Sequence, residues 1–285
     1  MILPRASVAA HRIGEVLHTH PTIPDGTQAS GDPACPGQVE FRNVSFRYPD
    51  AEEYVLKDIS FTAKRGETVA IIGSTGCGKS TVVNLIPRFY DATEGQVLVD
   101  GVDVREYDQR SLRNKIGYVS QKATLFTGTI ASNVAYGDNG EAPPSPADVQ
   151  AAVATAQAED FVTHLEGGYE GYVAQGGANL SGGQKQRLSI ARAIARKPEI
   201  LLFDDAFSAL DYKTDRVLRS ALDQTCQNTT RIIVAQRIGT IRDADQIIVL
   251  DDGQIAGIGK HQDLMQTCGV YQQIALSQLS KEELA

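Results

Sequence analysis

The feature that most constrains this chain is the octet GSTGCGKS at 73–80, which has the form G-x-x-x-x-G-K-S. The run before it, 67–72, is apolar and β-branched, and the run after it, 81–90, begins like a helix. Glycines at such a junction let the backbone bend so that successive N–H groups face one anion. Lys79 would then reach the β- and γ-phosphates, and the Ser80 hydroxyl would face Mg²⁺. The octet therefore predicts a nucleoside triphosphate site; the alternative is a glycine turn of an α/β protein without a ligand.

Composition narrows the class of protein. The chain has 285 residues, of which 42% are hydrophobic, enough for one large or two modest cores. Its net charge of −8 argues against a broad basic surface for nucleic acid. There is no apolar run of about 18 residues and no secretory signal peptide, so no membrane span is predicted. Four scattered cysteines without a C-x-x-C pair argue against a zinc site or a disulfide framework, and fit a reducing cytosol.

Apolar runs and turn residues alternate along the chain. Strands are predicted at 39–48, 59–63, 67–72, 96–100, 116–119, 200–203, 231–235 and 246–250. Helices are predicted at 1–18, from Lys79 onward, within 129–165 with a polar break at 137–145, at 181–196, at 214–224 and in the tail. This order predicts an α/β domain with a mostly parallel core sheet and an antiparallel part near the start. Residues 19–38 hold four prolines and three glycines with little that could pack, which predicts a linker.

Five blocks stand in a fixed order: Tyr48, the octet at 73–80, Gln121 after a strand, LSGGQ at 180–184, and ILLFDDAFSALD at 200–211. Together they resemble the nucleotide-binding domain of ATP-binding-cassette (ABC) transporters over about 39–276. YVSQKATLFTGTIASNVAYG and IIVLDDGQIAGIGKHQDLM are similar to multidrug-type exporter cassettes. RIGEVLHTHPTIPD is similar to the segment that joins such a cassette to its last membrane helix.

The resemblance implies a P-loop NTPase fold of the ABC ATPase type. It implies an antiparallel β subdomain beside the core sheet and a helical subdomain, at about 125–197, that carries LSGGQ. Residues 1–38 would be a linker from a preceding transmembrane domain that is not in this chain. Residues 39–276 would form the nucleotide-binding domain, and 277–285 a C-terminal tail.

The resemblance also implies roles for particular residues. ATP and Mg²⁺ would be the cofactors, and Tyr48 would stack on adenine, unless it is simply a core tyrosine. Residues around the phosphates would be Gly73, Ser74, Thr75, Gly76, Cys77, Gly78, Lys79, Ser80 and Thr81. Ser80, Gln121 and Asp204 would organise Mg²⁺. In a head-to-tail pair of cassettes, the γ-phosphate bound by the partner would be capped by Leu180, Ser181, Gly182, Gly183 and Gln184, and the seam of the pair would hold Ser208 and Asp211.

Two positions depart from the family pattern. Active cassettes carry Glu after the Asp that ends the strand, where this chain has Asp205, and a His after the next strand, where it has Gln236. The Asp205 carboxylate would sit about 1.5 Å further back, and a displacement of that order can cost about 10²-fold in rate. Glutamine cannot take the protonated, charged state of a histidine. The loop 173–177 also lacks the charged pair that exporters often show before LSGGQ.

Because both changes affect one site while LSGGQ is intact, we expect one half of a heterodimeric exporter, with Asp205, Gln236 and Gln121 forming a weakened catalytic group. Its partners would be a second nucleotide-binding domain on a different chain and a transmembrane domain, at the cytoplasmic face of the cell membrane. One alternative is a homodimeric cassette in which Asp205 suffices as the base. A third possibility, an ABC ATPase of DNA maintenance or translation, lacks support because the chain is acidic and has no coiled-coil insertion or second cassette.

Overall fold

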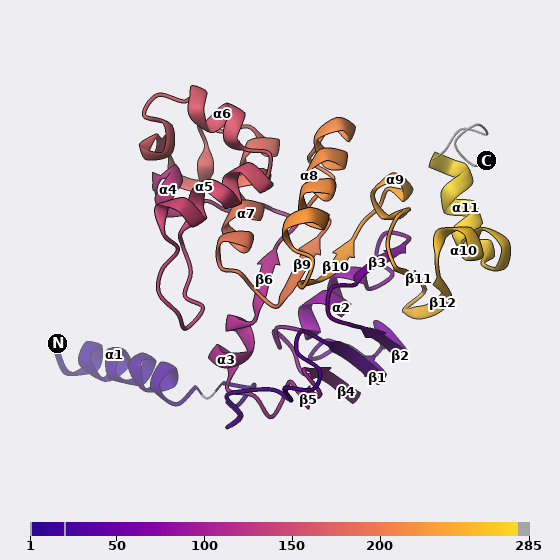
Figure 1. Ribbon diagram of the computed structural model, residues 1–285. Coiled ribbons are helices and arrows are strands. Elements are labelled where there is room, and N and C mark those ends of the chain that lie inside the picture. The colour runs from indigo at the N-terminus through magenta and orange to yellow at the C-terminus, as the bar shows by residue number, and fades with distance from the viewer. Residues whose placement is uncertain (1, 20, 279–285) are drawn as a thin grey trace.

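The computed structural model describes residues 2–19 and 21–278. Two sheets form its centre, and most helices lie above and beside the central sheet (Figure 1). Within the described residues, no helix has the length and apolar character needed to cross a lipid bilayer. The expected α/β architecture is confirmed, and each sheet matches one of the two expected parts.

The central sheet consists of β3 (Thr68–Gly73), β6 (Ile116–Val119), β9 (Ile200–Asp204), β10 (Thr230–Val234), β11 (Gln246–Asp251) and β12 (Gln254–Gly259). The strands lie in the order β12-β11-β3-β10-β9-β6. Neighbouring strands run parallel, except for the β11–β12 hairpin. Every residue of β9 and β10 is buried, as expected for parallel strands that are covered on both faces.

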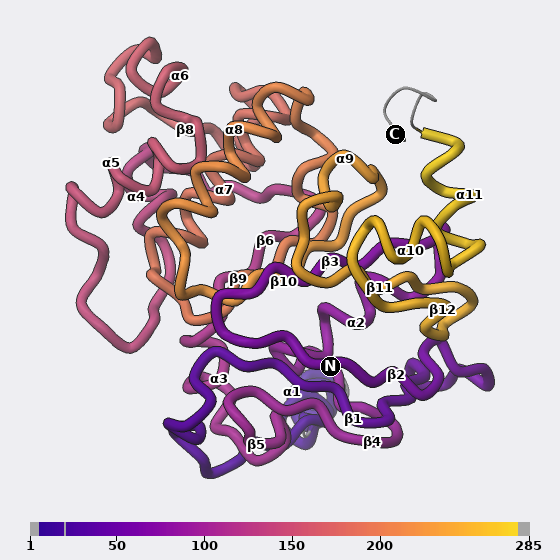
Figure 2. Tube along the Cα trace, turned by 45° about the vertical axis from the view of Figure 1, so that its right-hand side comes forward, coloured from indigo at the N-terminus to yellow at the C-terminus, as the bar shows by residue number. Residues whose placement is uncertain are grey.

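The second sheet is antiparallel and lies below the central one in Figures 1 and 2. Its order is β2-β1-β4-β5, with β1 at Val39–Phe46, β2 at Leu56–Ala63, β4 at Glu94–Val99 and β5 at Val102–Asp103. The rings of Phe41 and Phe61 stack across β1 and β2 with their centroids 4.6 Å apart. This cross-strand aromatic pair helps to fix the register of the two strands.

Alternate residues of the central strands enter two different cores. In β3, Ala70 and Ile72 belong to one core, and Val69 and Ile71 belong to the other. The first core is completed by α5 (Pro146–Thr155), α7 (Gly182–Ala195) and α8 (Tyr212–Thr225). The second is completed by α2 (Lys79–Leu85) and the antiparallel sheet. Because successive side chains of a strand point to opposite faces of the sheet, the central strands contribute to both cores.

A helical part stands to one side of the sheets (upper left in Figure 1). It contains α5 and α7 together with α4 (Ile130–Val134), α6 (Glu159–His164), the 3₁₀ turns η1 (Gly168–Glu170) and η2 (Gln175–Gly177), and the short strands β7 (Gly128–Thr129) and β8 (Tyr172–Val173). The expected break before α5 is confirmed. There Ser145 caps the helix, because its side chain accepts a hydrogen bond from the Asp148 N–H while the Asp148 carboxylate accepts one from the Ser145 N–H.

The remaining helices are α3 (Gln109–Asn114), α9 (Ile238–Ile241), α10 (His261–Thr267) and α11 (Gly269–Gln278). Helix α2 is shorter than the stretch 81–90 suggests, because Pro87 has no N–H with which to continue it. The predicted helical tail is confirmed as far as Gln278, so the expected boundary at 276 falls inside α11. Residues 279–285 lie outside the described residues.

The N-terminal segment corrects one prediction. Helix α1 (Ile2–Leu17) does project from the body (Figure 1), but the stretch after it is not loose. The Gly26 N–H donates to the Tyr107 carbonyl at 3.0 Å, and the Gly37 N–H donates to Asp100 Oδ1 at 2.6 Å. A Cβ at Gly31 would lie 2.2 Å from Asp100 Cβ. Composition predicted little packing because it counts apolar side chains, whereas this segment is held through its backbone.

Candidate functional site

Four loops meet at one edge of the central sheet. The octet follows β3, Asp204 and Asp205 stand at the end of β9, Gln236 follows β10, and Gln121 follows β6. These strands are parallel and adjacent, so their carboxyl ends share one edge. Ligands of open α/β sheets bind at that edge.

Three glycines of the octet are required by its geometry. A Cβ at Gly73 would lie 2.1 Å from the Leu250 carbonyl oxygen of β11, so only glycine permits this close approach. Gly76 and Gly78 have φ angles of +85° and +98°, in the left-handed region that side chains disfavour. Glycine at these positions therefore lets the loop turn its N–H groups outward without a clash or backbone strain.

The two left-handed glycines should respond differently to alanine. A Cβ at Gly76 meets nothing within 4 Å, so Gly76→Ala should cost only backbone strain, roughly 1–2 kcal/mol. A Cβ at Gly78 would lie 2.6 Å from Leu56 Cδ2, so Gly78→Ala should lose about 1–3 kcal/mol more through overpacking. Urea denaturation of both variants measures the difference. Equal losses would show that the Leu56 contact has no energetic weight.

Lys79 lies folded over the loop and is 9% exposed. Its ammonium donates to the carbonyl oxygens of Gly73 at 2.9 Å and Ser74 at 2.6 Å, and it lies 3.7 Å from Cys77 Sγ. The positive charge is thus held by neutral carbonyl oxygens, without a carboxylate partner in these contacts. An anion above the loop would meet both this cation and the loop N–H groups.

Two hard oxygen ligands lie together beside the loop. Ser80 Oγ donates to Asp204 Oδ1 at 2.7 Å, and the Tyr118 hydroxyl donates to Asp204 Oδ2 at 3.4 Å. A hydroxyl next to a carboxylate fits Mg²⁺, which keeps several waters and takes few protein ligands beside phosphate oxygens. The predicted ligands Ser80 and Asp204 are therefore brought together, whereas Gln121 contacts Asp205 and not Asp204.

All three predicted catalytic side chains meet at one atom. Asp205 Oδ2 accepts hydrogen bonds from Gln236 Nε2 at 2.8 Å and from Gln121 Nε2 at 3.2 Å. Burial raises the pKa of Asp205, and the charge of Asp204 raises it further, against the hydrogen bond from Gln121. Asp205 also has a φ of +49°, a left-handed conformation that aspartate tolerates better than most side chains. Asp205 thus has a partly desolvated carboxylate whose Oδ2 accepts hydrogen bonds from two side-chain amides.

Tyr48 lies beside the end of the octet and is half-buried. Its hydroxyl is 3.0 Å from Thr81 Oγ1, and its ring packs edge-on against Phe46 and Tyr90. The same ring lines an open hollow of about 560 Å³. The side chain therefore takes part in a core contact and is also accessible to a flat ligand.

The LSGGQ segment opens α7 at the protein surface. Ser181 caps the helix: its side chain accepts from the Gln184 N–H at 3.3 Å, and the Gln184 side chain accepts from the Ser181 N–H at 2.9 Å. Leu180 is buried, whereas Ser181 and Gly182 are exposed. A Cβ at Gly183 would meet the Ala209 carbonyl at 3.3 Å, so LSGGQ lies against the segment between the predicted seam residues Ser208 and Asp211. Of these, Ser208 is exposed and Asp211 caps α8 through the Thr214 N–H.

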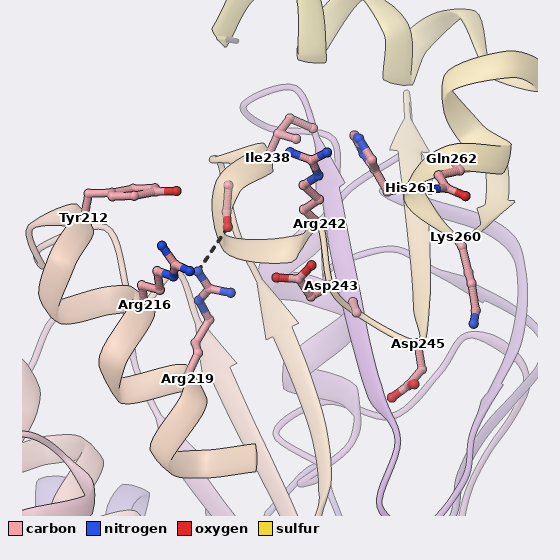
Figure 3. Close-up of a pocket in the computed structure, with 12 residues that line it drawn as sticks. Tyr212, Arg216, Arg219, Ile238, Arg242, Asp243, Asp245, Lys260, His261 and Gln262 are labelled. Carbon is pink, nitrogen blue, oxygen red and sulfur yellow. Dashed lines mark hydrogen bonds between the residues drawn. The ribbon is translucent and has the colours of Figure 1, made fainter. Parts of the chain in front are cut away.

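A second open hollow, of about 720 Å³, lies among α8, α9 and α10 (Figure 3). Its walls carry positively charged side chains, including Arg216 and Lys260, and negatively charged ones, including Asp243 and Asp245. Arg219 is paired with the buried Asp215 and donates to the Gly239 carbonyl, the contact drawn in Figure 3. This hollow has no glycine-rich loop, so it is distinct from the triphosphate site.

Comparison with protein families agrees with this geometry. A family model described as ABC transporter matches residues 56–208, which run from β2 through the octet and LSGGQ to Ser208. The chain belongs to the ABC transporter family. Membership of this family implies that the triphosphate bound at the octet is ATP. It also confirms the resemblance that the five sequence blocks indicate.

Several proteins of the ABC transporter family are similar to this chain. An uncharacterised ABC transporter ATP-binding protein of Mycobacterium tuberculosis is 48% identical over 279 residues, 97% of this chain and 47% of that protein. An ATP-dependent lipid A-core flippase of Pseudomonas putida is 43% identical over 269 residues, 94% of this chain and 44% of the flippase. The chain spans about half the length of these curated relatives.

A solved ABC structure matches the fold. The structure of a bacterial Atm1-family ABC exporter with ATP bound superposes with a TM-score of 0.90 at 38% identity, over 98% of this chain and 48% of that chain. The expected ABC ATPase fold, with its parallel core sheet, antiparallel sheet and LSGGQ-bearing helical part, is therefore confirmed. The roles assigned to single residues and the domain boundaries stay predictions.

The sequence did not indicate two residues that lie beside the proposed ATP site, Tyr118 and Arg237. Tyr118 donates to Asp204, and Arg237 donates to the carbonyl oxygens of Ser208 at 3.0 Å and Leu210 at 3.2 Å. Tyr118 stands in the strand before Gln121, and Arg237 directly follows Gln236. Their positions next to predicted site residues were the available signal, but only the folded chain shows what they contact.

Proposed function

We propose that this chain is the ATP-binding cassette of an ABC exporter, and that it pairs head to tail with a second cassette. ATP would be held by Tyr48 and the octet through Thr81, with Mg²⁺ at Ser80 and Asp204 and with Gln121 near the metal. The similarity to a lipid flippase and to an Atm1-family exporter supports export as the activity of the whole protein. ATP binding would close the pair of cassettes, and hydrolysis would release it.

The chain's own ATP site would be catalytically weak. The single observation that carries this proposal is the pairing of Gln236 and Gln121 on Asp205 Oδ2. A water-activating carboxylate needs a free oxygen that points toward the water. Asp205 is one methylene short for that task, and both amides occupy Oδ2, which leaves Oδ1 as the oxygen that can accept a proton from the water. The site would therefore bind ATP tightly and hydrolyse it slowly.

The second cassette would then be a different chain with a competent site, which LSGGQ from this chain completes. Leu180 to Gln184 would cap the partner's ATP, and Ser208 and Asp211 would lie at the seam. This proposal is supported by an intact, exposed Ser181 at the start of a 14-residue helix. A transmembrane domain would be the other partner, which would place the cassette at the cytoplasmic face of the cell membrane.

A homodimeric cassette remains the second candidate. Burial raises the pKa of Asp205, and a carboxylate with a raised pKa is a stronger base. The two candidates differ in the turnover of this polypeptide by itself. The heterodimer proposal expects little ATP hydrolysis until a second cassette is added. Turnover by this polypeptide alone that equals that of the completed pair would support the homodimer instead.

Removing the Ser181 hydroxyl should separate its structural role from its proposed catalytic one. Ser181→Ala and Ser145→Ala each remove a serine that caps a helix in a reciprocal pair, so each should cost about 1 kcal/mol of stability. Only Ser181→Ala should lower ATP hydrolysis in the assembled pair, by about tenfold or more, because one phosphate contact is lost. Phosphate release and thermal unfolding of both variants measure this. Equal activity losses would reduce Ser181 to a helix cap.

A further inference from the structure

The last described residue of α11 holds the loop that follows β10. Gln278 Nε2 donates to the Gln236 carbonyl at 2.7 Å, and Gln278 Oε1 accepts from the Ile238 N–H at 2.9 Å. The Gln278 amide thus binds the carbonyl of residue 236 and the N–H of residue 238. In a sheet, a backbone N–H and C=O of the neighbouring strand would bind the same two groups. Gln278 therefore fixes the conformation of the loop at 236–238.

This loop has two further attachments, both directed at the ATP site or the seam. The Gln236 side chain donates to Asp205, and the Arg237 guanidinium donates to the carbonyls of Ser208 and Leu210. Because Gln236 and Arg237 belong to the backbone stretch that Gln278 holds, a change at Gln278 alters the orientation of both side chains. Gln278 lies 42 and 40 residues along the chain from the two backbone groups that it holds.

Helix α11 is itself firmly seated. Tyr271 and Ala275 are fully buried, and they share one helix face with Gln278 at spacings of seven and three residues. The Tyr271 hydroxyl lies 2.8 Å from His261 Nδ1 in α10. The backbone that carries Gln278 is therefore fixed by the core, whereas Gln236 and Arg237 are exposed between the buried Ala235 and the buried Ile238 at the start of α9.

We propose that Gln278 is a positioning residue for the ATP site and the seam. It acts by holding the loop at 236–238, so that Gln236 reaches Asp205 and Arg237 holds the segment 208–210. The inference rests on the proposed function for its effect on turnover, but the grip on the loop is independent of that function.

Two substitutions test the proposal by different routes. Gln278→Ala removes both hydrogen bonds. Gln278→Asn keeps the same donor and acceptor but is one methylene shorter, so it cannot span both backbone groups from a fixed helix. Gln273 is exposed on the same helix and makes no side-chain hydrogen bond to another described residue, so Gln273→Ala is the matched control.

The first measurement is residue-resolved hydrogen exchange of the chain without nucleotide. Losing two hydrogen bonds should make the Ile238 amide exchange about 5- to 30-fold faster in both Gln278 variants. Exchange in β9 and β10 should not change, nor should it change anywhere in Gln273→Ala. An unchanged Ile238 amide, or a uniform increase across β9 and β10, would overturn the proposal.

The second measurement is ATP hydrolysis by the complete transporter. Both Gln278 variants should lower kcat several-fold with little change in KM for ATP, because Arg237 would no longer hold the segment 208–210, which belongs to the proposed seam with the partner's site and not to the octet. Faster Ile238 exchange with an unchanged kcat would overturn the role in positioning. If the complete wild-type transporter does not hydrolyse ATP, the proposed function fails, while the exchange result still decides whether Gln278 holds the loop.

Discussion

Replacing Asp205 with Glu and Gln236 with His in the same chain should raise ATP turnover by about 10²-fold. The longer side chain moves the carboxylate about 1.5 Å toward the attacking water. The histidine removes the shorter of the two amide contacts to Asp205 Oδ2, which is 2.8 Å long. Each substitution alone should give less, because the carboxylate must be both long enough and released. Turnover is measured as phosphate release by the polypeptide alone and in the assembled pair.

The higher turnover of the double variant should come with lower stability, because of the backbone conformation at position 205. Its φ of +49° is tolerated better by aspartate than by glutamate, so the double variant should unfold at a lower temperature. Asp160→Glu is a matched control, since that carboxylate is 94% exposed and lies in α6. It should change neither turnover nor stability. If the wild-type polypeptide hydrolyses ATP as fast as the double variant, the weak-site proposal is refuted.

Replacing Lys79 with Ala should weaken ATP binding by about 100-fold or more. The Lys79 ammonium is nearly buried above the octet, where hydrogen bonds to a charged group are worth roughly 1.5–3 kcal/mol. A loss of about 2.8 kcal/mol corresponds to a factor of 100 in the dissociation constant. Equilibrium binding of ATP with Mg²⁺ measures this directly. The exposed Lys213→Ala in α8 serves as the control and should bind like the wild type.

Thermal unfolding provides an independent measurement of the same loss. At an ATP concentration of about 100 times the wild-type dissociation constant, bound ligand stabilises the wild type by about 2.7 kcal/mol. The Lys79→Ala variant at that concentration should gain only about 0.4 kcal/mol. If ATP stabilised both proteins by the same free energy, the octet would not be the ATP site.

Much of the fold follows from local pattern. The short apolar runs at 200–203 and 246–250 predict buried strands because only a sheet covered on both faces accepts them, and β9 and β11 confirm both. The octet predicts its own turn, since Gly76 and Gly78 have left-handed φ angles and a Cβ at Gly73 would clash with the Leu250 carbonyl. The helix predicted at 181–196 also begins where it was expected, as α7 directly after Ser181.

The contacts within the site were less accessible to sequence reasoning. Gln121 and Gln236 lie 84 and 31 residues from Asp205 along the chain, and nothing in their spacing indicates that both donate to one oxygen. The resemblance placed Gln121 at the metal, but its amide contacts Asp205. Backbone-mediated packing, as at Gly26, was also missed, because main-chain groups are common to every residue and leave no compositional trace.

The backbone attachment of the N-terminal segment has a mechanical consequence. Tension applied along α1 would not reach β1 first. It would be delivered first at Gln109 and Tyr107, beside the edge strand of the antiparallel sheet, because Gln109 donates to the Ile23 carbonyl and the Asp25 carboxylate and the Gly26 N–H donates to the Tyr107 carbonyl. Apart from Asp25, most side chains of residues 21–38 can then differ without changing where tension enters, whereas any side chain at Gly26, whose Cβ would lie 2.2 Å from the Glu106 carbonyl oxygen, would shift that point of entry.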